Sequence, residues 1–232
     1  MLKERVRADT NLLEKPPWSA LTTTHAAFAL GNDLARRYRP EVAAMASVQD
    51  DSEESLQSLR AVMRLGDVVG LFDSRPIAGA GLEVIVHKTI EQMIYEGDAP
   101  SVISDNYVTL SAADVPEMMA LVDLTKPGPF APRTIELGSY IGVRSGRLIA
   151  MAGERMKCGG FTEVSAVCTD PDYCDRGLSS ALVKTLMRNI IGRGETPFLH
   201  IYSDNTRAGS LYERLGFMHR RTLTVTVLRR PN

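Results

Sequence analysis

The stretch Phe161–Ser180, FTEVSAVCTDPDYCDRGLSS, has the residue pattern of a site that binds a phosphate-bearing cofactor. Its first half is rich in β-branched residues and predicts a strand. Its second half contains Gly177 directly before an apolar-periodic segment that predicts a helix. The first N–H groups of a helix have no partner within the helix, and the helix dipole favours an anion beside them. We therefore expect the loop before Leu178 to cradle a phosphate group.

A second stretch, Ile201–Phe217, carries polar side chains that suit catalysis. Asn205 precedes a helix-patterned segment that contains Tyr212 and ends at a glycine. A tyrosine hydroxyl can donate a proton to a leaving group, and an asparagine can cap a helix and also bind a ligand. The same helical spacing gives Tyr212 a purely structural place in the core, so the pattern alone leaves both roles open.

The elements around these two stretches alternate between strands and helices from residue 106 onward. Alternating and helical periodicities predict strands at 106–110, 140–143, 148–152, 161–169, 197–202 and 222–228, and helices at 111–124, 178–191 and after 204. The order β-α-β-β-β-α-β-α-β predicts an α/β or α+β fold with helices packed on a mixed sheet.

The first hundred residues show a less regular pattern. Apolar spacing predicts a helix over about Thr23–Tyr38, and the Pro16-Pro17 pair is expected to break any earlier helix. A second helix is expected between a cap at Asp51 or Ser52 and Gly66. Short β-branched runs predict strands at 67–73 and 82–87.

A polar, turn-rich segment at 96–104 predicts a domain boundary near Ser104. Residues 1–104 then form a divergent N-terminal half in which no residues point to a known chemistry. Residues 105–232 form a second domain that contains both motif-bearing stretches.

Composition and charge exclude several classes of protein. The hydrophobic content of 44% and charged content of 24% are typical of a soluble globular chain, and a net charge of −1 provides no global attraction to nucleic acid or membrane. The apolar runs are too short to span a bilayer, and the charged N-terminus does not resemble a secretory signal, so we expect a cytoplasmic protein. The cysteines form no CxxC pair and the histidines are scattered, so we expect no metal.

The two motifs, VCTDPDYCDRGLSSALV and IYSDNTRAGSLYERLGF, occur in the order and separation that resemble the GNAT superfamily of acyl-CoA N-acyltransferases. Within it they look most similar to the glycine N-acyltransferase-like branch. The resemblance covers about 107–230 and implies a GNAT-like mixed, twisted sheet with flanking helices. It also makes the N-terminal half a candidate for a degenerate copy of the same fold.

The resemblance implies that the first motif binds acyl-CoA. The family loop Q/R-x-x-G-x-G/A maps onto Cys174–Ser179, whose backbone amides would wrap the diphosphate. In the family two neighbouring strands splay apart to bind the pantetheine arm, and here these are 161–169 and 197–202. The cofactor-binding residues that follow are Val167, Cys168, Thr169, Cys174, Asp175, Arg176, Gly177, Leu178, Ser179, Ser180 and Asn205.

Two residues of the loop depart from the family pattern. Cys174 replaces the usual Arg or Gln, and Asp175 replaces a common glycine. A carboxylate near the diphosphate is expected to weaken cofactor binding by about 1 kcal/mol.

The resemblance also implies catalytic roles. Tyr212 matches the family tyrosine that can protonate the departing CoA thiolate, and Glu163 matches a catalytic glutamate that acts as general base in several members. Strand alternation is expected to place Glu163 on the same face as Ser165 and Val167. The alternative for Glu163 is a carboxylate at a solvated strand end. The oxyanion donor is expected to be the backbone N–H of Val167.

The resulting function is transfer of an acetyl group from acetyl-CoA to a primary amine, by direct attack in a ternary complex. The alternative is a catalytically weak or inactive CoA-binding regulatory protein, favoured by Cys174 and Asp175. A covalent intermediate on Cys168 is disfavoured because no histidine adjoins it in the sequence. The partner is expected to be a small-molecule or peptide amine, with Arg133 and Arg144 as weak indications of a carboxylate-bearing acceptor. The chain is expected to be a monomer or a homodimer.

Overall fold

The computed structural model describes residues 9–101 and 106–232. The strands are β1 (Ala29–Gly31), β2 (Ala35–Tyr38), β3 (Met45–Val48), β4 (Val68–Asp73), β5 (Glu83–Ile94), β6 (Val108–Thr109), β7 (Tyr140–Ser145), β8 (Arg147–Lys157), β9 (Phe161–Thr169), β10 (Thr196–Tyr202) and β11 (Met218–Arg229). The α-helices are α1 (Pro16–Thr22), α2 (Glu53–Val62), α3 (Val115–Thr125), α4 (Leu178–Gly192) and α5 (Thr206–Arg214). Short 3-10 helices are η1 (Thr10–Leu13), η2 (Ala26–Phe28), η3 (Ala112–Asp114), η4 (Thr134–Leu137) and η5 (Pro171–Tyr173).

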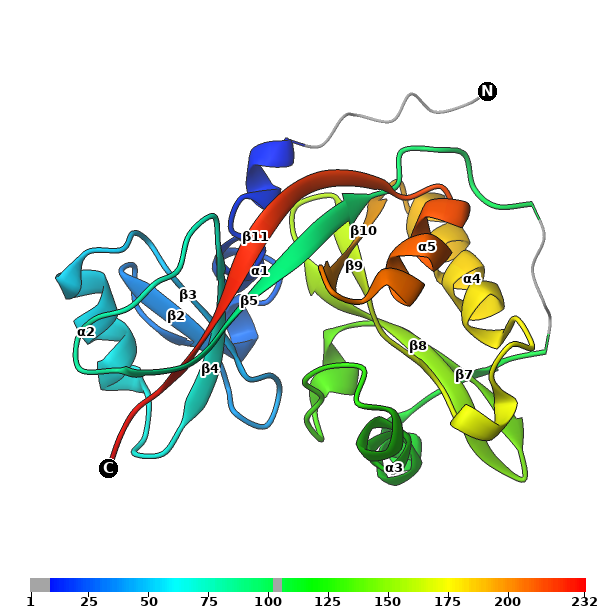
Figure 1. The fold of residues 1–232 in the computed structure, drawn as a ribbon, viewed down its shortest axis with the longest axis horizontal. Coiled ribbons are helices and arrows are strands. Elements are labelled where there is room, and N and C mark those ends of the chain that lie inside the picture. The colour runs from blue at the N-terminus through cyan, green and yellow to red at the C-terminus, as the bar shows by residue number, and fades with distance from the viewer. Residues whose placement is uncertain (1–8, 102–105) are drawn as a thin grey trace.

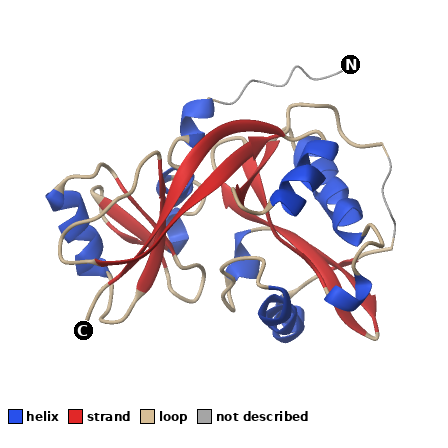
Figure 2. Cartoon of the chain, viewed as in Figure 1, coloured by secondary structure: helices blue, strands red, loops and turns tan. Residues whose placement is uncertain are grey.

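The described strands form one mixed sheet of eleven strands in the order β1-β2-β3-β4-β11-β5-β10-β9-β8-β7-β6. Figure 2 shows this sheet running through the whole molecule, with helices packed against it in both halves. The fold class predicted from the sequence, a mixed twisted sheet with flanking helices, is therefore confirmed.

Strands β5 and β11 connect the two halves of the sheet. They pair antiparallel over nearly their whole lengths, from Met218 opposite Ile94 to Arg229 opposite Glu83. Strand β11 also pairs with β4, and β5 also pairs with β10 (Figure 1). The C-terminal strand thus completes the sheet of the N-terminal half. The boundary predicted at Ser104 lies outside the described residues, and the division into two domains stays a prediction.

The helix predicted over Thr23–Tyr38 is wrong, because this segment forms η2 and the β1–β2 hairpin. Gly31 has a φ of +122°, and a Cβ there would collide with the carbonyl oxygen of Ala35. The side chain of Asn32 accepts hydrogen bonds from the N–H groups of Leu34 and Ala35 and closes the turn. This local turn chemistry outweighs the apolar spacing that predicted a helix.

The Pro16-Pro17 pair begins α1 instead of breaking a helix. Proline suits the first helical position because its missing N–H would have no helical acceptor there. The second predicted helix is confirmed as α2, whose N-cap Ser52 accepts a hydrogen bond from the N–H of Ser55 at 3.2 Å. It ends at Val62, before the predicted stop at Gly66.

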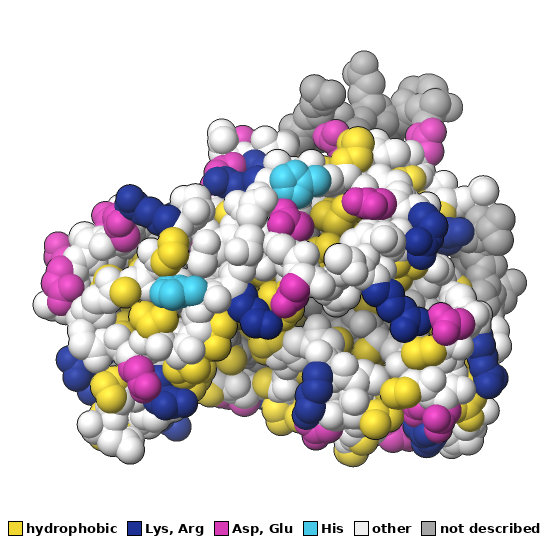
Figure 3. All heavy atoms as spheres, viewed as in Figure 1, with side chains coloured by type: hydrophobic (Ala, Val, Ile, Leu, Met, Phe, Trp, Pro, Cys, Tyr) yellow, Lys and Arg dark blue, Asp and Glu magenta, His cyan; other side chains and the backbone are white. Residues whose placement is uncertain are grey.

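The C-terminal half follows the predicted order of strands and helices. Helix α3, preceded by a capping box between Ser111 and Asp114, packs against β8 and β9 from one side. Helix α4 packs against the same strands from the other side (Figure 1). No helix in the described segments combines the length and the apolar character needed to cross a bilayer. On the face shown in Figure 3, Lys and Arg side chains are interspersed with Asp and Glu.

Candidate active site

Strands β9 and β10 separate to form the candidate site. Their parallel pairing covers Phe161–Glu163 opposite Thr196–Phe198, and the described structure contains no further pairing between them. Beyond this point a cavity of about 430 Å³ opens, lined by Val164 to Thr169 on one side and by His200 to Tyr202 on the other. The expected splay of the two strands is thus present.

A β-bulge in β9 shapes one wall of this cavity. Ala166 adopts a φ of +51°, and the register with β8 shifts between Ser165 and Cys168. The extra residue breaks the alternation, and Val167 packs in the same apolar cluster as Val164. The expectation that Val167 shares a face with Glu163 is therefore wrong.

The loop between β9 and α4 lines a second cavity of about 450 Å³. Gly177 is the N-cap of α4 with a φ of +75°, and the N–H of Ala181 donates to its carbonyl oxygen at 3.0 Å. The N–H groups of the residues between them have no acceptor within the helix. The hydroxyl groups of Thr169 and Ser179 hydrogen-bond at 2.8 Å and tie the strand to the helix start.

The two residues that depart from the family pattern both line the second cavity. Asp175 has a φ of +60°, a backbone conformation that explains why glycine is common at this position. Its carboxylate pairs with Arg207 at 2.8 Å, and both side chains are largely exposed, at 87% and 76%. The negative charge of Asp175 is thus partly offset by a neighbouring cation. The Cys174 thiol lies 3.8 Å from the carbonyl oxygen of Asp170.

The other expected cofactor-binding residues also lie at the cavities, with one exception. Residues of the expected set that line one or both cavities are Val167, Cys168, Thr169, Cys174, Asp175, Gly177, Leu178, Ser179, Ser180 and Asn205. Arg176 lines neither cavity and instead lies over the Tyr173 ring, 4.8 Å from its centroid. Asn205 caps α5 by accepting a hydrogen bond from the N–H of Ala208 at 3.1 Å. Burial raises the pKa of Cys168 to about 11, which leaves little thiolate for a covalent mechanism.

Tyr212 lies where the two cavities meet, since it lines both. Its side chain is buried, and its hydroxyl has no hydrogen-bond partner in the described parts of the chain. Burial, followed by the nearby Cys168, raises the pKa of Tyr212 above its usual value. The hydroxyl is therefore protonated at neutral pH, as a proton donor must be, while burial makes it a weaker acid than a solvated tyrosine.

Glu163 does not fit the general-base role that the sequence predicted. It is 0% exposed and lines neither cavity. Arg155 donates to both carboxylate oxygens at 2.7 Å, and the His200 ring binds one of them at 2.7 Å. Burial alone would raise the pKa of Glu163, but Arg155 and His200 outweigh it and hold the pKa at about 2. The alternative of a solvated carboxylate does not fit either, because Glu163 is an internal counter-ion.

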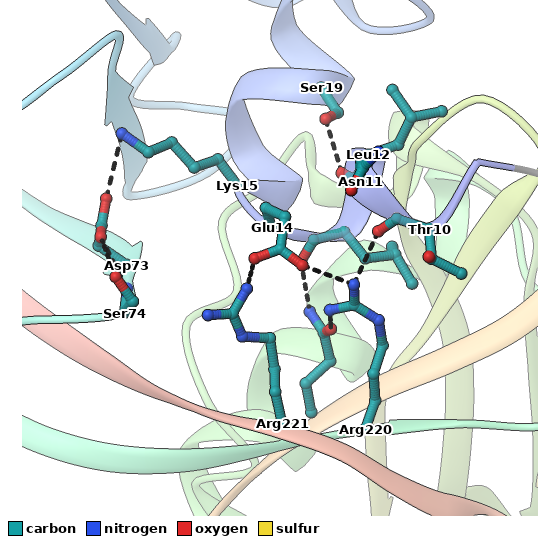
Figure 4. Close-up of polar contacts among 12 residues, drawn as sticks. Thr10, Asn11, Leu12, Glu14, Lys15, Ser19, Asp73, Ser74, Arg220 and Arg221 are labelled. Carbon is teal, nitrogen blue, oxygen red and sulfur yellow. Dashed lines mark hydrogen bonds and ion pairs between the residues drawn. The ribbon is translucent and has the colours of Figure 1, made fainter.

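A chain of hydrogen bonds connects this counter-ion to the N-terminal segment. His200 lies opposite Gln92 in the sheet, and its Nε2 is 3.0 Å from the Gln92 amide nitrogen. That nitrogen also donates to the Leu13 carbonyl oxygen at 3.0 Å, while Arg220 donates to the amide oxygen at 2.7 Å. Figure 4 shows the outer end, where Glu14 contacts Arg220 and Arg221.

Sequence reasoning missed the cations at the two cavities. Arg155 lines the first cavity, and Arg207 and Arg214 line the second. Arg207 lies inside the second motif, two residues after Asn205. Its position in the motif could therefore have indicated a cation at this cavity. Arg155 had no such signal, because its partners come from other strands. Among the described residues, no group of three or more His, Cys, Asp or Glu side chains could hold a metal ion.

The comparisons with known proteins concern both halves of the chain. Residues 140–226 match the family described as FR47-like protein. A protein from Novosphingobium aromaticivorans, assigned to the GNAT acetyltransferases, has a solved structure that superposes with a TM-score of 0.90. It is 38% identical over 95% of this chain and 99% of that chain. A comparison with curated protein sequences found no match.

Two more distant structures share the fold. A Drosophila protein has a TM-score of 0.62 and 16% identity, over 97% of this chain and 91% of that chain. A GCN5-related N-acetyltransferase from Kribbella flavida has a TM-score of 0.57 and 15% identity, over 92% of this chain and 95% of that chain. The 38% identity to the Novosphingobium protein over nearly the whole length identifies this chain as a member of the GNAT family of acetyltransferases.

Proposed function

We propose that the protein is an N-acetyltransferase that moves an acetyl group from acetyl-CoA to a primary amine by direct attack in a ternary complex. The observation that carries this proposal is that two cavities share one wall, formed by Val167, Thr169, Asn205, Ala208 and Tyr212. One cavity adjoins a helix start and the other lies between the two halves of the sheet. This arrangement suits two substrates that meet at Tyr212.

The second cavity suits the phosphates of CoA. The N–H groups at the start of α4 that lack a helical acceptor can bind an anion, and the helix dipole adds to this effect. Arg207 and Arg214 line the same cavity and contribute positive charge. The open edge of β9 at Val167 and Thr169 then leaves backbone groups for the pantetheine arm. Assignment to the glycine N-acyltransferase-like branch rests on the motifs alone and remains part of the proposal.

The chemistry follows from the position of Tyr212. The neutral amine attacks the thioester carbonyl, and the N–H of Val167 stabilises the oxyanion that forms. Collapse of this intermediate breaks the carbon–sulfur bond, and Tyr212 gives its proton to the departing thiolate. Water accepts the proton that the amine loses. Tyr212 then regains a proton from water. No described carboxylate lines the first cavity to act as a direct base.

Isothermal titration calorimetry with acetyl-CoA, combined with a thiol-release assay over a panel of amines, tests the proposal. Binding together with amine-dependent thiol release supports it. Binding without transfer to any amine would favour the CoA-binding regulatory protein instead. Absence of binding would contradict both functions.

A further inference from the structure

We propose that the acceptor is an amine that also carries a carboxylate and an apolar group, and that Arg155 binds the carboxylate. This inference rests on the proposed function and concerns the first cavity. The charged residues lining that cavity are Lys126 and Arg155, and no Asp or Glu of the described residues lines it. A polycationic amine would find no opposite charge there, whereas an anionic group would.

Arg155 presents one free end to the cavity. Its Nε and Nη2 donate to Glu163 at 2.7 Å each, while Nη1 makes no hydrogen bond in the described structure. The side chain is only 11% exposed, yet the residue lines the cavity. A ligand carboxylate that enters the cavity can bind Nη1 and Nη2 side by side, in the paired geometry that a guanidinium favours.

The position of Arg155 is fixed by a series of hydrogen bonds that begins at its counter-ion. Glu163 is held by Arg155 and by His200, and the ring of His200 is held in turn by Gln92. Arg220 donates to the Gln92 side-chain oxygen, so the Gln92 nitrogen must face His200. Nε2 of His200 then accepts and Nδ1 donates to Glu163. A guanidinium held in this way loses little conformational freedom on binding a ligand.

Lys126 does not compete for this role. It lies at the C-terminal end of α3, its side chain is 73% exposed, and its ammonium group pairs with Asp123 at 3.1 Å. Arg155 is thus the buried cation of the cavity. Because Glu163 balances its charge, Arg155 would hold a ligand carboxylate by directed hydrogen bonds and not by an unpaired charge.

The N-terminal half and β11 supply an apolar wall. Met45, Phe72, Ile90, Val225 and Val227 line the cavity, and Phe72 packs edge-on against His200 at a centroid distance of 5.2 Å. The cavity that Arg155 lines is thus apolar over this wall. An acceptor with an apolar side group would bury that group here while its carboxylate reaches Arg155.

The two arginines that the sequence suggested for this role are occupied elsewhere. Arg133 binds Glu136 and Glu41 at the surface. Arg144 binds Asp114 and Glu117 beside α3. Neither residue lines a described cavity, so the weak indication from Arg133 and Arg144 is not supported and Arg155 takes their place.

Binding of reaction products tests the inference without relying on turnover. In the presence of CoA, calorimetry compares N-acetylphenylalanine with N-acetylphenethylamine, which lacks only the carboxylate. The wild-type protein should bind the carboxylate-bearing compound at least about tenfold more tightly, equivalent to about 1.4 kcal/mol. Equal affinities would overturn the inference.

A double variant, Arg155→Met with Glu163→Gln, removes the cation without leaving a buried charge unpaired. It should lose the preference to within about twofold while acetyl-CoA binds as in wild type. Arg155→Lys is the second variant, because it keeps the charge and loses the paired donors, and it should retain only part of the preference. A full preference in both variants would overturn the role of Arg155.

Turnover separates this inference from the proposed function. Relative kcat/KM is measured for phenylalanine, phenethylamine and spermidine. Absence of acetyl-CoA binding would overturn the proposed function. Acetyl transfer that favours spermidine or phenethylamine would overturn only the acceptor class, and a preference for phenylalanine would support it. If acetyl-CoA binds but no acetyl group is transferred to any of the three amines, the relative affinities of the two N-acetyl compounds still test the acceptor class.

Discussion

Arg220 donates a hydrogen bond from Nη1 to the side-chain oxygen of Gln92 at 2.7 Å and thereby fixes which way the amide points. A register shift in β11 between His219 and Arg221 leaves Arg220 as an extra residue that can turn toward β5. Through Gln92 and His200 this contact reaches the counter-ion of Arg155. The N-terminal segment is thus connected to the candidate acceptor cavity by a continuous series of polar contacts.

Gln92→Leu should lower the free energy of unfolding by about 1–3 kcal/mol. The substitution leaves the buried His200 nitrogen and the Leu13 carbonyl oxygen without their donor. Urea unfolding measures the change. The matched control is Gln57→Leu, because Gln57 is exposed on α2, and its effect should stay within about 0.5 kcal/mol. Equal effects of the two substitutions would show that Gln92 contributes no more to the free energy of unfolding than an exposed glutamine does.

Tyr212→Phe should lower kcat roughly 10²-fold while the Kd for acetyl-CoA changes less than about twofold. The hydroxyl lies between the two cavities and holds its proton, so its loss removes a proton donor and little binding surface. Thiol release and calorimetry measure the two quantities. Tyr107→Phe, at a half-buried tyrosine that lines neither cavity, should leave both unchanged. Wild-type kcat in Tyr212→Phe would exclude this tyrosine as the acid.

Glu163→Gln should destabilise the fold by roughly 3–5 kcal/mol, because it leaves the Arg155 guanidinium buried without a counter-ion. Adding Arg155→Met should recover part of this loss, so the two effects should not add. Urea unfolding of the single and double variants measures both. The pH at which the rate rises on the alkaline side should be the same as in wild type in any Glu163→Gln protein that stays folded. Loss of this alkaline rise would restore Glu163 as the base.

Gly177→Ala should weaken acetyl-CoA binding by about tenfold. A Cβ at Gly177 meets nothing within 4 Å, so the cost comes from the positive φ and not from a collision. Holding alanine in that conformation costs about 1–2 kcal/mol and would shift the N–H groups at the start of α4. Gly192→Ala is the control, since it also has open space and lacks the positive φ. It should leave binding unchanged, and equal losses in both would contradict the explanation.

The C-terminal half could be predicted from the sequence because its signals are local. The alternation of 222–228, the glycine after α5 and the cap before α4 each specify one element over a few residues. The same locality explains the error at Thr23–Tyr38, where an Asn-Asp turn decides between helix and hairpin. Elements were thus predictable wherever neighbouring residues alone select the conformation.

Long-range pairing could not be predicted. Strand β11 lies between β4 and β5, so Arg229 faces Val68 and Glu83, which no local pattern indicates. The burial of Glu163 has the same origin, since Arg155 and His200 reach it from neighbouring strands. Sequence reasoning therefore indicated the loop before α4 and Tyr212, whose motifs are contiguous and which both line the cavities. It missed Arg155, because the contacts that define its position come from three different strands.

His25 should make the fold less stable as the pH falls below neutral. Its Nδ1 lies 2.9 Å from the Tyr38 hydroxyl in the core, and burial, followed by the charge of Lys157, lowers its pKa from 6.5 to about 4. Between these values the unfolded chain binds a proton that the folded protein does not, so stability decreases with falling pH. The loss should reach about 2 kcal/mol at pH 5 and about 3 kcal/mol at pH 4, with little more below that. His25→Gln keeps a polar group beside Tyr38 and should flatten the dependence between pH 6.5 and 5 in urea unfolding. An unchanged slope in this variant would assign the acid sensitivity to other groups.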